Sequence, residues 1–159
     1  MHISKIRIFL IMTGLLLGIG ILAILGIFVL PILASQVASA YPELIDMQKP
    51  MLILGELVIT TIALALVLAL NLLRLAYSGK GFSVATVKTL RLIGWVFLFA
   101  LLPLIAIIVY TESRVKSSIS NIYMAIGCGI FFIAGNLFHL LAELFAHGEM
   151  YKSELDLTV

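Results

Sequence analysis

Charged residues are scarce in this sequence, and cysteine occurs only once. Of the 159 residues, 11% are charged and 63% are hydrophobic, whereas an ordinary soluble domain has about 25% charged residues. A soluble domain of this size could not bury so much apolar surface, and a disordered chain would need the opposite composition. The single cysteine excludes a disulfide framework and a cysteine-cluster metal site. The formal charge of +2 does not indicate direct nucleic-acid binding. What remains is an integral membrane protein in contact with the lipid bilayer.

Four long apolar stretches account for most of the chain. About 20 helical residues cross a hydrocarbon core about 30 Å thick, and the sequence predicts spans at about 8–33, 51–76, 90–110 and 122–146. Short segments of alternating polarity, which a membrane β-barrel would need, are absent from the sequence. We therefore predict a single all-α membrane domain over residues 1–159, folded as a four-helix bundle.

The connectors between these spans are short and polar. Residues 34–50 contain two prolines and are predicted to form a turn-rich loop, and residues 111–121 a small hairpin. Ser83 is a candidate N-cap for the third helix, because its hydroxyl can accept from a free amide of the next turn. Pro103 allows a kink in the third span. Residues 147–159 are predicted to form an acidic cytoplasmic tail.

The distribution of lysine and arginine predicts the orientation. Cytoplasmic loops retain basic residues, and seven lie on the side of the termini against three on the other side. The seven are Lys5, Arg7, Arg74, Lys80, Lys88, Arg91 and Lys152; the three are Lys49, Arg114 and Lys116. Both termini are therefore predicted to lie in the cytoplasm.

A cleaved signal peptide is the competing interpretation of the first span. Ala38, Ser39 and Ala40 resemble a signal-peptidase site. The apolar run before them, Ile8–Leu33, is much longer than the roughly 7–15 residues of a signal sequence. We therefore expect the first span to be retained.

Polar side chains inside the apolar spans need an explanation, because they are costly in lipid. Asn71 and Arg74 in the second span should lie at the same depth as Asn136, His139 and Glu143 in the fourth. The spacing of the last three places them on one helix face, and predicts an ion pair between Arg74 and Glu143. The favoured interpretation is a structural clamp between helices. A proton relay and a metal site are alternatives, although a metal normally needs more ligands than this cluster offers. No metal or other cofactor is predicted.

Glu56 lies about 8 Å inside the outer end of the second span. It could line an outward-facing cavity and bind a cation or a cationic ligand. The favoured interpretation is that it snorkels to the surface or bonds to a neighbouring span, beside Gly127–Gly129. Gly14 and Gly18 form a small-residue motif that favours packing within the bundle over a homodimer face, and a homo-oligomer stays open.

Two cytoplasmic stretches are candidates for binding a partner. Acidic residues alternate with leucines near the end of the tail, which predicts a strand-like segment able to join the sheet edge of a partner. A solvated terminus, or a tail folded back on the basic loop, is an equal alternative. The candidate residues are Phe82, Ser83, Lys88 and Arg91 in the loop, and Glu154, Asp156 and Leu157 in the tail.

These two stretches also carry a resemblance. The tail Glu154–Val159 and the loop that begins Gly81-Phe82-Ser83 and continues through Lys88, Arg91 and Gly94 resemble a bacterial family of small four-span membrane proteins. That family is catalogued only as a domain of unknown function. Its members are often encoded beside a small helix-turn-helix regulator, which implies that the two work together. The resemblance implies residence in the bacterial cytoplasmic membrane, and it supplies no catalytic residues. Members often carry an asparagine where this chain has Ala85–Val87.

The leading functional hypothesis is a non-enzymatic membrane regulator. No nucleophile elbow, phosphate loop or pair of catalytic carboxylates is present in the sequence. The inner loop and the acidic tail would dock a cytosolic partner, such as a DNA-binding regulator, while the bundle senses a signal. One alternative is a small transporter or channel subunit that uses the intramembrane Glu, His and Arg residues. Another is an immunity protein against a membrane-active peptide.

Overall fold

A computed structural model describes residues 5–78, 83–116 and 118–157 of the chain. The elements, in order, are α1 (Lys5–Ile24), the π-helical turn η1 (Leu25–Val29), α2 (Leu30–Ala40), the 3-10 helix η2 (Pro42–Met47), α3 (Gln48–Tyr77), α4 (Val84–Phe99), α5 (Leu101–Arg114) and α6 (Ile119–Leu157). These described ranges contain no strand. The predicted all-α fold is confirmed.

The helices combine into four long apolar rods. They comprise Ile6–Ala40, Pro42–Tyr77, Val84–Arg114 and Ile119–Gly148, each between 30 and 36 residues long. About 20 residues suffice to cross a bilayer, and the outer faces of the rods expose leucine, isoleucine and phenylalanine side chains along their length. Because lipid rather than water can accept such faces, the chain is a multi-pass membrane protein, as predicted.

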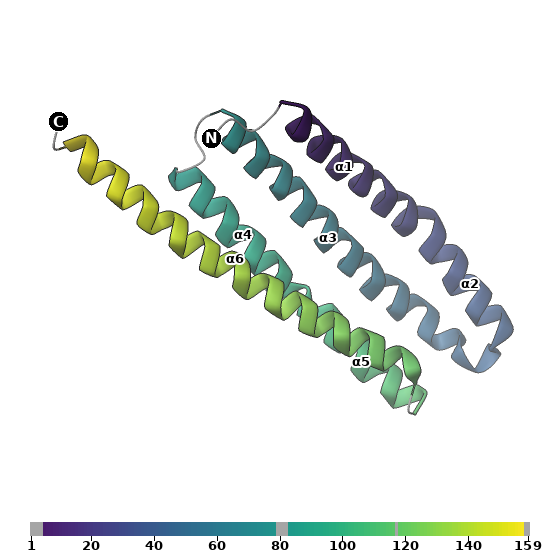
Figure 1. The fold of residues 1–159 in the computed structure, drawn as a ribbon. Helices are drawn as coiled ribbons and strands as arrows, with labels where there is room; N and C mark the ends of the chain where they lie inside the picture. Colours follow the sequence, from purple (N-terminus) through teal and green to yellow (C-terminus); the bar gives the residue numbers. More distant parts are fainter. Residues whose placement is uncertain (1–4, 79–82, 117, 158–159) are drawn as a thin grey trace.

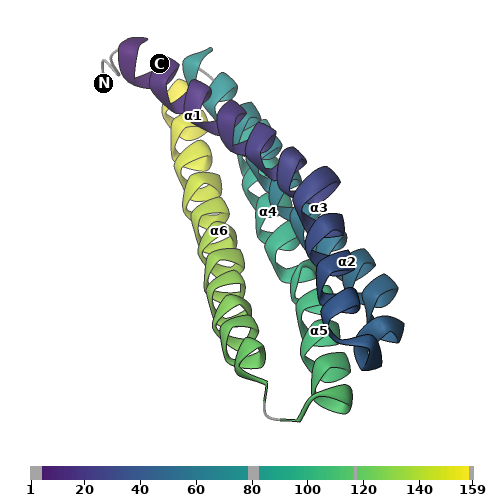
Figure 2. The same cartoon turned by 90° about the vertical axis from the view of Figure 1, so that its right-hand side faces the viewer.

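The rods form a four-helix bundle in which they lie side by side in chain order (Figure 1). The rod of α1 and α2 packs on α3, α3 packs on α4 and α5, and these two pack on α6. In the described ranges, no Cα atoms within 8 Å join α6 to α3 or to α1. Figure 2 shows α6 along one side of the bundle, next to α4 and α5. The first turn of α1 and the last turn of α6 lie at the same end of the bundle (Figure 1).

Two prolines explain the two interruptions within the rods. The ring of a helical proline clashes with the carbonyl four residues before it. For Pro103 this is the carbonyl of Phe99, where α4 ends before α5 resumes at Leu101. For Pro31 it is the carbonyl of Ile27, in the middle of the widened turn η1. The break between α4 and α5 lies where Pro103 was predicted to allow a kink, whereas the widened turn before Pro31 was not predicted.

The tightest packing joins α4 to α6. Ile93 and Ala142 are 1% and 0% exposed, and a cluster of Val87, Leu90 and Ala142 closes the seam toward the termini. Farther along α4 from the termini, a Cβ atom on Gly94 would lie 2.9 Å from the carbonyl oxygen of Gly135. The backbones of α4 and α6 therefore approach so closely at this point that only glycine fits in both.

Two segments that were predicted to be non-helical, residues 34–50 and the tail, are mostly helical. Residues 34–50 do not form a loop: α2 continues to Ala40 and η2 follows from Pro42, with a single non-helical residue, Tyr41, between them. Tyr41 precedes a proline, and this position disfavours helical backbone angles. The predicted strand-like tail is also wrong, because α6 continues without a break as far as Leu157. The connector predicted over residues 111–121 is shorter than expected, because α5 continues to Arg114 and α6 begins at Ile119.

Candidate functional site

The start of α4 presents the predicted basic residues at the end of the bundle that holds the termini. Ser83 caps the helix as predicted: its Oγ accepts from the Thr86 backbone N–H at 3.3 Å. Val87 and Leu90 face α6, whereas Lys88 and Arg91 are exposed. The two cations are therefore free of the seam and available at the surface. Phe82, the fourth candidate in this loop, lies outside the described residues.

Asn71 pairs with α4 and not with the fourth span. Its Nδ2 donates to the Oγ1 of Thr89 at 3.4 Å, and that hydroxyl in turn donates to the Ala85 carbonyl at 2.8 Å. Thr89 is buried, so the pair is a polar contact within the α3–α4 seam. The hydrogen bond also shows the register of the antiparallel helices α3 and α4, because it places Asn71 at the same depth as Thr89.

Arg74 is exposed near the end of α3. It lines a cavity of about 560 Å³ between α1 and α3, together with Phe9, Met12 and Tyr77. The structure contains no ion pair between Arg74 and Glu143, both of which it describes, so that prediction is wrong. The physical reason is the chain-order packing, in which α4 separates α3 from α6.

His139 lies in the α4–α6 seam. Its ring meets Trp95 edge to face, with ring centroids 5.1 Å apart and an interplanar angle of 80°. The His139 Nε2 atom is buried and has no hydrogen-bond partner among the described residues. A Cβ atom on Gly94 would lie 2.8 Å from Cδ2 of the ring, so the glycine makes room for it.

The other two polar residues of α6 point elsewhere. Asn136 and Glu143 are exposed, and the Asn136 Nδ2 donates back to the Phe132 carbonyl at 2.8 Å. On a helix the three residues fall within an arc of about 60°, as their spacing predicts. Of the three, only His139 reaches the seam with α4, so they do not form one polar cluster with Asn71 and Arg74.

Glu56 contacts the first span. A Cβ atom on Gly26 would lie 2.9 Å from Oε2 of Glu56, so the carboxylate lies directly over the η1 backbone. The expected neighbours Gly127–Gly129 belong to α6, which does not contact α3 in the described ranges. Gly26 is not among the predicted site residues; the signal in the sequence that points to it is Pro31, the residue that widens the adjoining turn.

The small-residue motif of the first span is used only in part. A Cβ atom on Gly18 would lie 3.3 Å from Leu66 of α3, whereas one on Gly14 would meet nothing within 4 Å. Gly55 on α3 is the closer contact, because a Cβ atom there would lie 2.8 Å from Leu30. The α1–α2 rod therefore packs on α3 through Gly18, Gly26 and Gly55.

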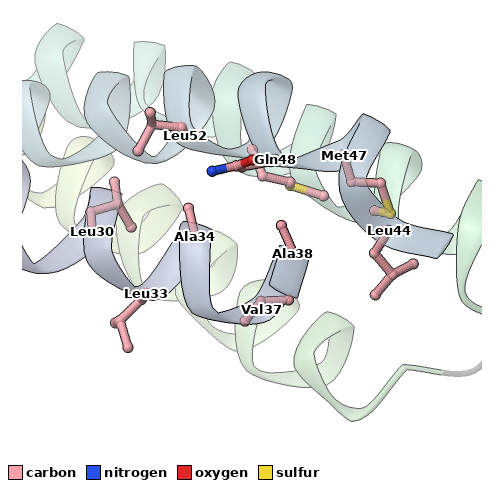
Figure 3. A pocket seen from close by; sticks show the side chains of 10 residues that line it. Leu30, Leu33, Ala34, Val37, Ala38, Leu44, Met47, Gln48 and Leu52 are labelled. Atoms are coloured by element: carbon pink, nitrogen blue, oxygen red, sulfur yellow. The ribbon is translucent and has the colours of Figure 1, made fainter. Parts of the chain in front are cut away.

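An apolar cavity of about 240 Å³ opens between α2 and the start of α3 (Figure 3). Gln48 is the single polar side chain in a lining that otherwise includes Leu30, Val37, Leu44 and Met47. It offers no acid, base or nucleophile. Among the described residues, no three His, Cys, Asp or Glu side chains are grouped closely enough to hold a metal ion.

The predicted partner-binding residues of the tail lie at the end of α6. Glu154, Asp156 and Leu157 belong to its last turns, within the polar segment of the helix that begins at Glu149. This end of the bundle therefore combines a helical acidic projection with the exposed cations at the start of α4.

The comparisons with known proteins identify one family. The model of one family, described as "Protein of unknown function (DUF2975)", matches residues 32–159. No curated protein and no solved structure matches the chain. The match runs from α2 to the end of α6 and includes the α4 cap, Glu56 and the α4–α6 seam. The chain therefore belongs to the family of proteins of unknown function DUF2975.

Proposed function

We propose that this protein is a non-enzymatic membrane interaction protein that docks a partner on the end of α6. The observation that supports this proposal is the length of that helix. α6 has 39 residues, and its polar, charged end begins at Glu149, so residues 149–157 extend the helix by about 13 Å beyond its apolar part. A helix that continues past the membrane surface holds its side chains in a fixed register, which a flexible terminus does not.

The charge of this extension suggests the chemistry of the partner. Glu149, Glu154 and Asp156 outnumber Lys152, so the extension carries a net negative charge. It would attract a basic surface, and acidic side chains on a basic DNA-reading surface compete with DNA phosphates for the same contacts. A DNA-binding regulator held at the membrane in this way is our proposed partner.

The proposal also requires the termini to face the cytoplasm of a bacterial cell. The excess of lysine and arginine at this end of the bundle supports that orientation. Lys88 and Arg91 contribute to the excess and are exposed beside the membrane, where each basic residue is attracted to anionic lipid by about 1 kcal/mol. They would hold the start of α4 at the inner surface.

Affinity capture from native membranes tests the proposal. Three tagged forms are compared: the wild type, a deletion of residues 149–159, and the Ser153→Pro variant, which keeps every charge but interrupts the helix. We expect one set of proteins to be lost from both altered forms. Undiminished capture with the deletion would reject docking on α6, and loss with the deletion but not with Ser153→Pro would show that charge alone suffices. Glu112→Gln is the matched control, because it removes one acidic charge at the opposite end of the bundle. This variant should capture the same proteins as the wild type.

A further inference from the structure

The cavity beside Glu56 has features that the proposed function does not use. Its volume is about 200 Å³, it lies between the first span and α3, and its other described lining residues are uncharged. Glu56 is half-buried, with Oε2 over Gly26. No hydrogen bond or ion pair joins Glu56 to another described residue. The cavity thus presents one carboxylate in apolar surroundings.

The antiparallel packing of α3 on α4 and α5 places this carboxylate well inside the membrane. Asn71 lies beside Thr89, so Glu56 lies near the level of Leu104 on α5. This level is about 12 Å from Glu112, counted along the helix. Leu57 lines a cavity with Leu102 and Pro103, which agrees with that level. A charged carboxylate at this depth would be stabilised by a cation, because an isolated charge in hydrocarbon is very costly.

The turn η1 leaves a second hydrogen-bond acceptor on Gly26, which also lines this cavity. In an α-helix the Gly26 carbonyl would accept from the N–H of Leu30, but here that N–H is bonded to the Leu25 carbonyl. In a π-helix the donor would be residue 31, which is a proline and has no N–H. The Gly26 carbonyl is therefore deprived of both of its ordinary helical donors, and a backbone acceptor in lipid has no water to replace them.

We propose that Glu56 and the Gly26 carbonyl form a binding site for a protonated primary amine that carries an apolar chain. The ammonium group offers three N–H donors and one positive charge, which matches one carboxylate and one unsatisfied carbonyl. The apolar walls, formed by residues such as Ile19, Leu22 and Ile59, accept the chain. A hard metal ion fits less well, because Ca²⁺ takes about six to eight oxygen ligands and Mg²⁺ about six, and this site supplies few.

Binding of radiolabelled n-octylammonium to the full chain in phosphatidylcholine nanodiscs tests the proposal. Empty nanodiscs give the partitioning background, which is subtracted. 1-Octanol and octyltrimethylammonium are the comparison ligands, because the first has no charge and the second has no N–H. We expect saturable binding of one octylammonium per protein chain, with neither comparison ligand displacing it at equal concentration.

Three variants separate the two acceptors. Glu56→Gln keeps the shape of the side chain and should reduce affinity at least tenfold. Pro31→Ala restores an N–H opposite the Gly26 carbonyl and should reduce affinity about tenfold, the effect of one lost hydrogen bond of about 1.4 kcal/mol. Glu143→Gln, a carboxylate on the exposed face of α6, should bind like the wild type. Thermal unfolding of each variant verifies that it is folded.

Two results would overturn the proposal. Equal octylammonium binding by the Glu56→Gln variant and the wild type would show that the carboxylate is not part of a site. Equal displacement by 1-octanol or octyltrimethylammonium would show an apolar cavity that recognises no N–H cation. Neither result would affect docking on α6, because the capture experiment depends on residues 149–157 alone.

Discussion

The ring of His139 on α6 meets the ring of Trp95 on α4 edge to face at a centroid distance of 5.1 Å, directly beside Gly94. The absence of a side chain at Gly94 is what allows this contact, since a Cβ atom there would overlap both the imidazole and the Gly135 backbone. One glycine therefore sets both the distance between two helices and the position of a buried imidazole.

Substitution of the seam glycines should destabilise the protein. In Gly94→Ala, the added methyl group would lie 2.9 Å from the Gly135 carbonyl oxygen, which belongs to the backbone and cannot rotate away. We expect a loss of about 1–3 kcal/mol in the free energy of unfolding, the usual cost of overpacking. Titration with SDS in mixed micelles measures it.

Gly14→Ala and Gly127→Ala are the matched controls for Gly94→Ala. A Cβ atom at either position meets nothing within 4 Å, so both variants should unfold like the wild type. A Gly94→Ala variant as stable as these two would contradict the close approach of α4 and α6.

Replacement of His139 by leucine should leave stability unchanged or raise it. The imidazole Nε2 is buried without a partner among the described residues, and a buried polar atom without a hydrogen bond costs about 1–3 kcal/mol. Leucine removes that atom and keeps much of the volume. The same SDS titration applies, and a marked loss of stability would mean that Nε2 has a partner in the membrane.

Asn71 and Thr89 should be coupled in a double-mutant cycle. Asn71→Leu and Thr89→Val each remove one side of the hydrogen bond between α3 and α4. We expect an interaction energy of about 0.6 kcal/mol, the average for hydrogen bonds between membrane helices. Asn136→Leu combined with Thr89→Val is the control cycle, because Asn136 bonds within its own helix, and its coupling should be zero. Equal coupling in the two cycles would contradict the Asn71–Thr89 contact.

Removal of the α4 cap should weaken the start of that helix. Ser83→Ala deletes the acceptor of the Thr86 backbone N–H, and loss of an N-cap costs about 1 kcal/mol. Hydrogen exchange of the first-turn amides should accelerate about fivefold, while the amides of α6 keep their rates. Ser113→Ala provides the comparison, because its hydroxyl bonds back to the Tyr110 carbonyl at the end of α5. Unchanged exchange at Thr86 would show that the cap is dispensable.

The predicted orientation can be tested with single cysteines in a Cys128→Ser background. Ser78→Cys lies at the end of α3 that faces the termini, and Ser113→Cys lies at the opposite end, and both positions are exposed. In intact cells a membrane-impermeant maleimide should label position 113 and leave position 78 unlabelled until the cells are opened. The reverse pattern would place the termini outside and remove the cytosolic partner from the proposed function.

Several local features of the fold could be read directly from the sequence. The lengths of the apolar runs gave the four spans, Ser83 gave the α4 cap, and Pro103 gave the break in the third rod. Each of these features depends only on residues within one segment of the chain, and not on contacts between segments. At residues 34–50 and in the tail, polar composition predicts irregular structure, but most of the backbone there is helical.

The sequence by itself determined that lipid is the surrounding medium, that four helices cross it, and roughly where each one enters. Only the tertiary structure decided which polar groups meet: Asn71 with Thr89, Glu56 with Gly26, and His139 with Trp95, where the sequence had suggested Arg74 with Glu143. The reason is physical. In lipid, one apolar helix face packs about as well as another. Which helices become neighbours therefore depends on where small residues let two backbones approach closely. That fit involves segments that are far apart in the chain.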